Sequence, residues 1–61
     1  MKTLRDYSSG RTFKNVEILV NAEDLPRDRD FITSMLDDDT MIRYSVYTDT
    51  NGFYYAVSED D

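Results

Sequence analysis

Apolar and polar residues alternate with a period of two in the first third of the chain. Between residues 13 and 20, the β-branched residues Val16, Ile18 and Val20 are separated by single residues, a pattern that predicts a strand. Phe13, Val16 and Val20 also fit the i, i+3, i+7 spacing of a helix. Because β-branched side chains lose rotamer freedom in a helix, we expect a strand over 13–20.

A second alternating stretch, residues 42–48, is followed by Asn51-Gly52 and then by the β-rich segment 53–57. Asn-Gly between two such stretches predicts a hairpin, because both residues tolerate positive φ. A two-residue turn and a four-residue turn place the same side chains on each face. One face is expected to carry Ile42, Tyr44, Val46, Phe53, Tyr55 and Val57. The other is expected to carry Arg43, Ser45, Tyr47, Tyr54, Ala56 and Ser58.

The segment between these stretches has helical spacing. Its apolar stripe consists of Leu25, Phe31, Ile32, Met35 and Leu36. Asp24 can cap such a helix, and Pro26 suits its first turn, where a missing N–H costs little. The three aspartates 37–39 oppose the dipole at a helix C-terminus, so the helix is expected to end near residue 37.

These elements give the order strand, helix, strand, strand. The expected fold class is α+β: a small antiparallel sheet that ends in the C-terminal hairpin, with one helix packed on one face. A chain of 61 residues forms one domain with a thin core, and residues 12–61 are expected to be this acidic α+β domain. Residues 1–11 are polar and include the turn signal Ser8-Ser9-Gly10, so we expect an N-terminal arm or an edge strand there.

The residue types that most enzymes need are scarce. The chain has no Cys and no His, which excludes disulfides, thiol redox chemistry, zinc fingers and histidine bases. With only two glycines, it contains no glycine-rich phosphate loop. A chain of this length can scarcely form a catalytic cleft. We therefore expect neither enzymatic activity nor a cofactor.

Two acidic stretches offer the oxygen ligands that hard cations prefer. Asp49-Thr50-Asn51-Gly52 resembles part of an EF-hand loop, but the first and twelfth positions of that loop would be Tyr47 and Ser58. A hairpin turn is the better interpretation. The side chains of Asp37–Asp39 splay in different directions, because they follow one another in the chain, so a solvated loop is favoured over a magnesium site. We expect no metal site.

The formal charge of −6 is unevenly distributed. Four basic and two acidic residues give +2 over residues 1–20, whereas three basic and eleven acidic residues give −8 over residues 21–61. Such a field repels nucleic acid and anionic membranes and attracts basic surfaces. The expected partner is a basic nucleic-acid-binding protein or complex, with no direct binding of nucleic acid or membrane.

Compartment and oligomeric state follow from weaker signals. No apolar run approaches the roughly 20 residues that a membrane helix needs, and no hydrophobic segment follows the N-terminus. A cytoplasmic protein is the simplest interpretation. Because a hairpin edge is available for pairing, we expect a monomer or a weak homodimer.

The candidate partner-binding residues are acids near the predicted helix ends, the hairpin and the C-terminus, together with two tyrosines. They are Glu23, Asp24, Asp28, Asp30, Asp37, Asp38, Asp39, Tyr47, Asp49, Tyr54 and Glu59. For the acids, a binding surface and simple solubility remain alternatives. For the tyrosines, a binding patch and a stabilising cross-strand pair remain alternatives.

In size, acidity and expected α+β layout, the chain resembles the small proteins that phages and mobile elements encode against host defences. These include DNA-mimic antirestriction proteins and anti-CRISPR proteins. The resemblance is carried by Glu23-Asp24, Asp28, Asp30, Asp37-Asp38-Asp39 and Glu59-Asp60-Asp61. It implies a stoichiometric inhibitor that blocks DNA binding by a CRISPR surveillance complex, in the host cytoplasm if the protein is phage-encoded. The alternative is an adaptor or regulatory subunit that docks through its sheet edge or its tyrosines.

Overall fold

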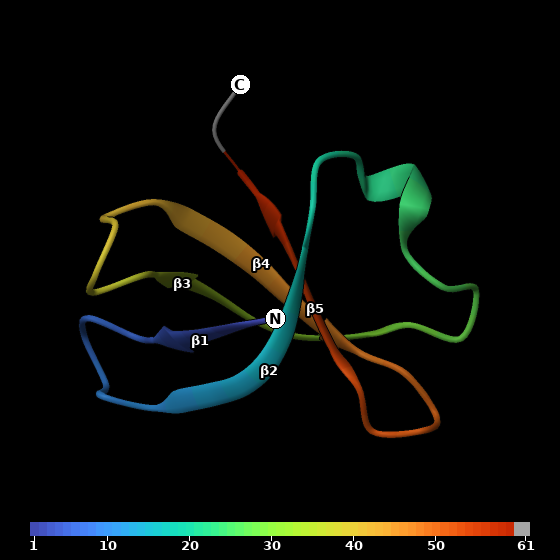
Figure 1. Ribbon diagram of the computed structural model, residues 1–61, viewed down its shortest axis with the longest axis horizontal. Coiled ribbons are helices and arrows are strands. Elements are labelled where there is room, and N and C mark those ends of the chain that lie inside the picture. Colours follow the sequence, from blue (N-terminus) through green and yellow to red (C-terminus); the bar gives the residue numbers. More distant parts are fainter. Residues whose placement is uncertain (60–61) are drawn as a thin grey trace.

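The described part of the chain, residues 1–59, is built mainly from strands. The computed structural model has five strands in these residues (Figure 1): β1 (Lys2–Arg5), β2 (Thr12–Leu19), β3 (Asp30–Leu36), β4 (Arg43–Thr48) and β5 (Tyr54–Ser58). One 3-10 turn, η1 (Ala22–Asp24), lies between β2 and β3. The predicted α+β fold class is therefore wrong, because residues 1–59 contain no α-helix that could pack on the sheet.

The five strands form one mixed sheet in the order β1-β2-β5-β4-β3. β2 and β5 run parallel, and the other neighbouring strands run antiparallel. The sheet curls until its two edge strands meet at one end (Figure 1), where Asp6 and Asp37 form a β-bridge. Two backbone hydrogen bonds flank this bridge: Tyr7 N–H to Leu36 O at 2.9 Å, and Asp38 N–H to Arg5 O at 2.8 Å. We refer to this junction of β1 and β3 as the seam.

The segment predicted to be helical, residues 25–37, contains β3 instead. Its pairing with β4 changes register between Phe31 and Thr33, as happens at a bulge. The extra residue reverses the alternation of faces, so that Phe31 is 59% exposed while Met35 is buried. Apolar side chains on both faces of an irregular strand therefore imitate the stripe of a helix.

The predicted helix start belongs to the crossover from β2 to β3. The turn η1 ends at Asp24, before Pro26, and the Pro26 carbonyl accepts a hydrogen bond from the Arg29 N–H at 3.3 Å in a separate turn. Asp24 therefore caps no helix. Within residues 1–59, no helix is both long and apolar enough to cross a membrane.

A strand was correctly predicted over most of 13–20, but a bulge interrupts the alternation of its residues. Asn15 has φ 57°, and β2 carries one residue more than β1 at this point. This bulge turns both Phe13 and Val16 into the core, although they lie three positions apart. Val20 lies beyond the end of β2 and is 91% exposed.

The C-terminal hairpin is confirmed, but its predicted register is wrong. Val46 pairs with Ala56, and Tyr47 with Tyr55, so Ala56 rather than Tyr55 shares the inner face with Val46. The turn has three residues between Asp49 and Phe53, because the Asp49 N–H donates to the Phe53 carbonyl at 3.2 Å. Gly52 has φ 85° and allows this three-residue turn.

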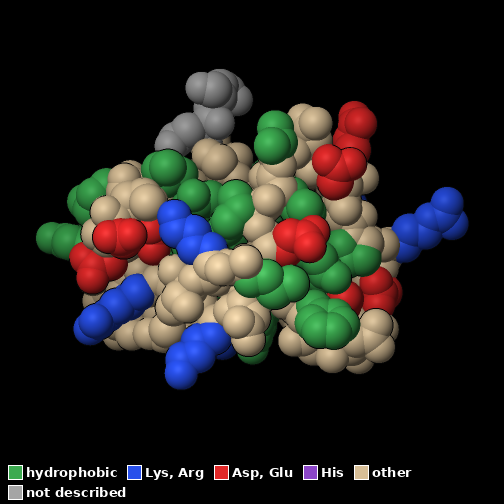
Figure 2. All heavy atoms as spheres, in the orientation of Figure 1, with side chains coloured by type: hydrophobic (Ala, Val, Ile, Leu, Met, Phe, Trp, Pro, Cys, Tyr) green, Lys and Arg blue, Asp and Glu red, His purple; other side chains and the backbone are tan. Residues whose placement is uncertain are grey.

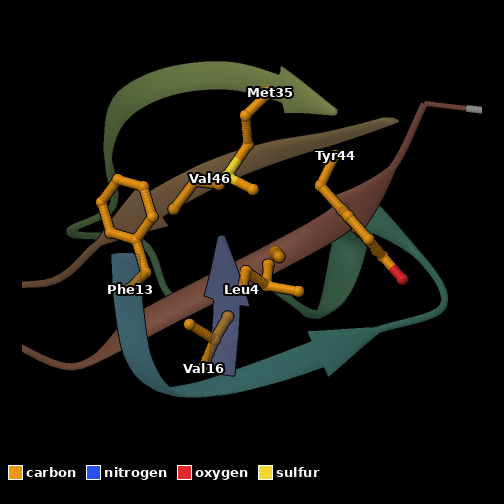
Figure 3. Packing of buried hydrophobic residues seen from close by; sticks show 7 residues of the cluster. Leu4, Phe13, Val16, Met35, Tyr44 and Val46 are labelled. Atoms are coloured by element: carbon orange, nitrogen blue, oxygen red, sulfur yellow. The ribbon is translucent and has the colours of Figure 1, made fainter. Parts of the chain in front are cut away.

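The core lies inside the curl of the sheet, where side chains from all five strands meet (Figure 3). It comprises Leu4, Phe13, Val16, Met35, Tyr44, Val46 and Ala56. Leu4, on β1, is fully buried, so of the two alternatives for residues 1–11 the strand is the one that forms. The Phe13 and Tyr54 rings pack edge to face at 5.4 Å. The curled sheet thus encloses its core without a covering helix.

Candidate functional site

Each of the three hairpin turns begins with an aspartate whose carboxylate accepts hydrogen bonds from its own turn. The donors are Ser8 and Ser9 for Asp6, Thr40 for Asp37, and Asn51 and Phe53 for Asp49. Asp37 is fully buried and Asp49 is 9% exposed. The carboxylates of these two candidate binding residues therefore stabilise turns and offer little surface to a partner.

Asp37 also holds the seam. Its Oδ1 accepts a hydrogen bond from the Arg5 N–H at 3.3 Å, and its Oδ2 accepts bonds from the Thr40 N–H at 3.0 Å and the Thr40 hydroxyl at 2.7 Å. Burial acts to raise the pKa of Asp37, but these hydrogen bonds and the charge of Lys2 outweigh it and hold the pKa below its usual value. Asp37 therefore remains ionised although it is buried.

Two more candidate acids join segments that are distant in sequence. Asp28, in the crossover, accepts hydrogen bonds from the Thr50 N–H, at 3.0 Å, and from the Thr50 hydroxyl. Glu59 accepts hydrogen bonds from the hydroxyls of Ser34 and Ser45, the latter at 3.0 Å. The hydroxyl of Thr50 lowers the pKa of Asp28, and that of Ser34 lowers the pKa of Glu59. Both carboxylates are held in place by the fold.

The remaining candidate acids are exposed and lie in two groups. Glu23, Asp24 and Asp30 lie at the crossover end of the sheet, and Asp38 and Asp39 lie in the turn between β3 and β4. β3 separates these ends, and its seven residues span about 20 Å. On the face seen in Figure 2, acidic side chains likewise gather toward the two ends rather than in one stripe. Asp60 and Asp61 lie outside the described residues.

The two candidate tyrosines lie on opposite sides of the sheet, contrary to the prediction. Tyr54 packs against Phe13 of the core. Tyr47 lies on the outer side, where its ring meets that of Phe31 edge to face at 5.6 Å. A joint surface of Tyr47 and Tyr54 does not exist, because the hairpin register differs by one residue from the predicted one.

The register places a different set of side chains together on the outer side. In neighbouring strands, Glu17 pairs with Tyr55, Tyr55 with Tyr47, and Tyr47 with Phe31. Directly paired residues project from the same face. Four side chains therefore form one line across β2, β5, β4 and β3, about 14 Å long at the usual strand spacing. We refer to Glu17, Tyr55, Tyr47 and Phe31 as the outer row.

The outer row is accessible and largely aromatic. Phe31 is 59% exposed, Glu17 is exposed, and Tyr47 and Tyr55 are half-buried. A parallel line of Leu19, Val57, Ser45 and Ser34 lies next to it on the same face. Leu19 and Val57 are half-buried and extend the apolar area beside Tyr55. The face combines ring surfaces with a carboxylate at one end.

Carboxylates surround Tyr55 in particular. Its hydroxyl donates a hydrogen bond to Asp49 Oδ2 at 2.8 Å. This bond raises the pKa of Tyr55, and partial burial and the negative charges of Asp49, Glu17 and Asp28 act in the same direction. The hydrogen bond holds the Tyr55 side chain in place through its hydroxyl, and the electrostatic potential around its ring is negative. Aromatic rings in such a field are well suited to bind cationic side chains.

The surface also has a shallow hollow of about 540 Å³. It is lined by Met1, Thr12, Lys14, Asn15, Gly52, Phe53 and Tyr54. Of residues 1–59, no Asp or Glu lines it, and Lys14 is the one basic side chain in its lining. Among residues 1–59, no group of three or more Asp, Glu, His or Cys residues is placed to hold a metal ion. The hollow therefore offers less chemistry than the outer row.

Sequence reasoning missed Phe31, Tyr55 and Glu17. Phe31 was assigned to a helix, and Tyr55 was assigned to the core face of the hairpin. A three-residue turn closed by Asp49 and Phe53, with Gly52 inside it, would have paired Tyr47 with Tyr55. The parallel pairing of β2 with β5, which brings Glu17 beside Tyr55, leaves no local signal in the sequence.

Comparisons with protein-family models, with curated proteins and with solved structures find no match to this chain. Its function is therefore argued from its own residues.

Proposed function

We propose that this protein is a non-enzymatic inhibitor that docks its outer sheet face onto a basic, nucleic-acid-binding surface of a partner protein. The observation that carries the proposal is the outer row: three aromatic side chains, with carboxylates around Tyr55, on a chain of charge −6. In its most specific form, the partner is a CRISPR surveillance complex, and the protein is a phage-encoded antagonist of its DNA binding that acts in the host cytoplasm.

The two kinds of acid have different roles in this proposal. The exposed acids at the two ends of the sheet attract the partner from a distance, and such attraction raises association rates more than final affinity. The acids that cap turns keep the face in shape. The outer row makes the close contacts, because aromatic side chains supply large contact areas at interfaces. Inhibition then requires contact by the rings as well as repulsion of DNA.

A second candidate function is an adaptor or regulatory subunit that uses the same face. The composition of the outer row favours this function. The row contains three rings and one carboxylate, whereas a mimic of DNA would present several carboxylates in place of phosphates. An adaptor would leave the nucleic-acid site of its partner free. The two functions therefore differ in whether DNA and this protein bind the partner at the same time.

Both can be tested on a panel of purified CRISPR surveillance complexes and restriction enzymes. Binding is measured by biolayer interferometry at 50 mM and 300 mM NaCl, with and without cognate DNA. We expect this protein to bind one member of the panel and to displace DNA from it. The affinity should fall at least about tenfold between the two salt concentrations. A bound partner that retains its DNA would support the adaptor and refute inhibition. Failure to bind any basic member at 50 mM NaCl would refute both.

The docking face is tested with two matched double variants. Phe31→Ala with Tyr47→Ala removes two rings of the outer row, whereas Asp38→Asn with Asp39→Asn removes two exposed charges at the far end. We expect the first to slow association little and to speed dissociation at least about tenfold, and the second mainly to slow association. Unchanged dissociation in the ring variant would mean that another surface makes the contacts.

A further inference from the structure

We propose that the outer row selects arginine over lysine, so that the partner element in contact with it carries an arginine stacked on the rings of Tyr55 or Tyr47 and paired with Glu17. This inference rests on the proposed function and specifies the residue that the face recognises. It follows from the order of side chains in the row, from the free carboxylate of Glu17 and from the sign of the surrounding charge.

The charge of the chain determines the kind of occupant. A second copy would bring two chains of charge −6 together, each with Glu17 on the docked face and with Asp28 and Asp49 beside it. Such like-charge contacts oppose association, and nucleic acid is disfavoured for the same reason. The occupant that complements this face is a basic segment of another protein.

The rings are held in place before any partner arrives. Tyr55 is anchored through its hydroxyl to Asp49 Oδ2 at 2.8 Å, and Tyr47 is braced by Phe31, with ring centroids 5.6 Å apart and planes at 72°. A fixed platform loses little side-chain entropy on binding. More than half of the Phe31 surface remains open to solvent, so a flat cation can reach the row.

Glu17 provides the second half of the recognition. It stands next to Tyr55 across β2 and β5, about one strand spacing away. Its exposed carboxylate has no hydrogen-bond partner among residues 1–59. A guanidinium group that stacks on a ring can direct its fork of N–H donors sideways to such a carboxylate. A lysine ammonium is a strongly hydrated point charge and gains less from the ring.

The chain already contains one contact of this kind. The guanidinium carbon of Arg11 lies 4.7 Å from the centroid of the Phe13 ring, where it covers the edge of the core. Arginine therefore stacks on an aromatic ring within this fold. Among residues 1–59, no arginine or lysine of the chain stacks on a ring of the outer row, so these rings can accept an arginine from a partner.

The test compares fluorescein-labelled nona-arginine and nona-lysine peptides, which carry equal charge, by fluorescence anisotropy at 100 mM NaCl. We expect nona-arginine to bind about fivefold more tightly, which is the factor that corresponds to about 1 kcal/mol, the upper end for an exposed cation–π contact. Tyr47→Leu with Tyr55→Leu keeps apolar area but removes the two rings on which the arginine would stack. It should abolish most of the preference and leave nona-lysine binding unchanged. Glu17→Gln should weaken nona-arginine more than nona-lysine.

Asp38→Asn with Asp39→Asn is the control, because it removes charge far from the row and should weaken both peptides equally. Thermal melts followed by circular dichroism confirm that each variant is folded. Equal binding of the two peptides to the unchanged protein would refute selection of arginine and leave the proposed function standing. A preference that survives in the leucine variant would refute the role of the row. No binding of either peptide would contradict the proposed function itself.

Discussion

Two turns at the seam have the same backbone geometry but different residues at their left-handed position. In one, Gly10 has φ 75° and donates its N–H to the Asp6 carbonyl; in the other, Met41 has φ 61° and donates its N–H to the Asp37 carbonyl. A residue with a Cβ pays about 1–2 kcal/mol in this conformation. The chain therefore has glycine at one of two equivalent positions and methionine, which is strained there, at the other.

Met41→Gly should therefore raise the free energy of unfolding, by about 1 kcal/mol. The Met41 side chain is 55% exposed, so its loss removes little packing, and the relief of the backbone exceeds the added entropy of glycine in the unfolded chain. Urea denaturation followed by circular dichroism measures the change. Gly10→Ala is the matched control: its added Cβ would meet nothing within 4 Å, so backbone strain alone should lower stability by about 1 kcal/mol. Equal stability of both variants would contradict this account.

The carboxylate of Asp37 can be tested by removing its charge alone. Asp37→Asn retains the shape, but its NH₂ group faces N–H donors from Thr40 or Arg5 and leaves a buried donor without an acceptor. We expect a loss of about 2 kcal/mol in the free energy of unfolding, measured in urea. Asp39→Asn, in the same turn but exposed, should change it by less than about 0.5 kcal/mol. Similar values for the two variants would mean that Asp37 does not hold the seam.

At the scale of elements, regular strands can be predicted from the sequence, whereas strands with bulges cannot. The hairpin β4–β5 follows from alternation and from Asn51-Gly52. Bulges in β2 and β3 reverse the alternation at Asn15 and beyond Phe31, and each bulge converts a two-residue period into spacing that fits a helix. The predicted helix failed because propensity and pattern are local, whereas pairing with β4 is decided by the whole sheet.

The same irregularity concealed the candidate site. The outer row exists only because four strands align in one register, and one of its contacts joins β2 to β5 in parallel. The acids were visible in the sequence, but their roles as turn caps depend on which residues begin each turn. Charge and composition therefore support only the proposal of a basic partner, whereas the residues proposed to contact it required the sheet order.

The contribution of β1 gives a prediction at this scale. Leu4 is fully buried in the core, whereas Val20, which alternates with Val16 and Ile18 in the sequence, is 91% exposed. Leu4→Ala should lower the free energy of unfolding by about 3 kcal/mol, and Val20→Ala should leave it unchanged within about 0.5 kcal/mol. Urea denaturation of both variants measures this. If Leu4→Ala proved as stable as Val20→Ala, β1 would not be part of the folded core.

At the scale of the whole molecule, the carboxylates form two groups, one hydrogen-bonded and one exposed. The carboxylates of the first group accept hydrogen bonds within turns or between segments. Those of the second group are exposed at the two ends of the sheet. These two groups make opposite contributions to stability. Free like charges repel and oppose folding, whereas hydrogen-bonded carboxylates favour it. The response to acid shows which contribution is larger.

Among residues 1–59, four carboxylates have pKa values below the usual 3.8 for Asp and 4.5 for Glu: Asp6, Asp28, Asp37 and Glu59. A group whose pKa is lower in the folded state contributes stability that is fully present above its unfolded pKa and is lost as pH falls through its folded pKa. Stability should therefore be constant above about pH 5 and fall steadily below about pH 4. Repulsion among the exposed acids opposes folding and so acts against this contribution.

At 150 mM salt the Debye length is about 8 Å, shorter than the roughly 20 Å between the two acidic ends. Salt therefore screens repulsion between the ends but not between neighbouring acids within one end, and we expect the hydrogen-bonded groups to dominate. Urea denaturation between pH 7 and pH 3 tests this, and the loss should persist at 1 M NaCl, because direct hydrogen bonds are not screened. Asp37→Asn should make the loss shallower, whereas Asp39→Asn should not. If stability stayed level or rose between pH 5 and pH 3, repulsion among the free acids would outweigh the hydrogen bonds of the turn carboxylates. The net effect of the acidic residues on the free energy of unfolding would then be destabilising.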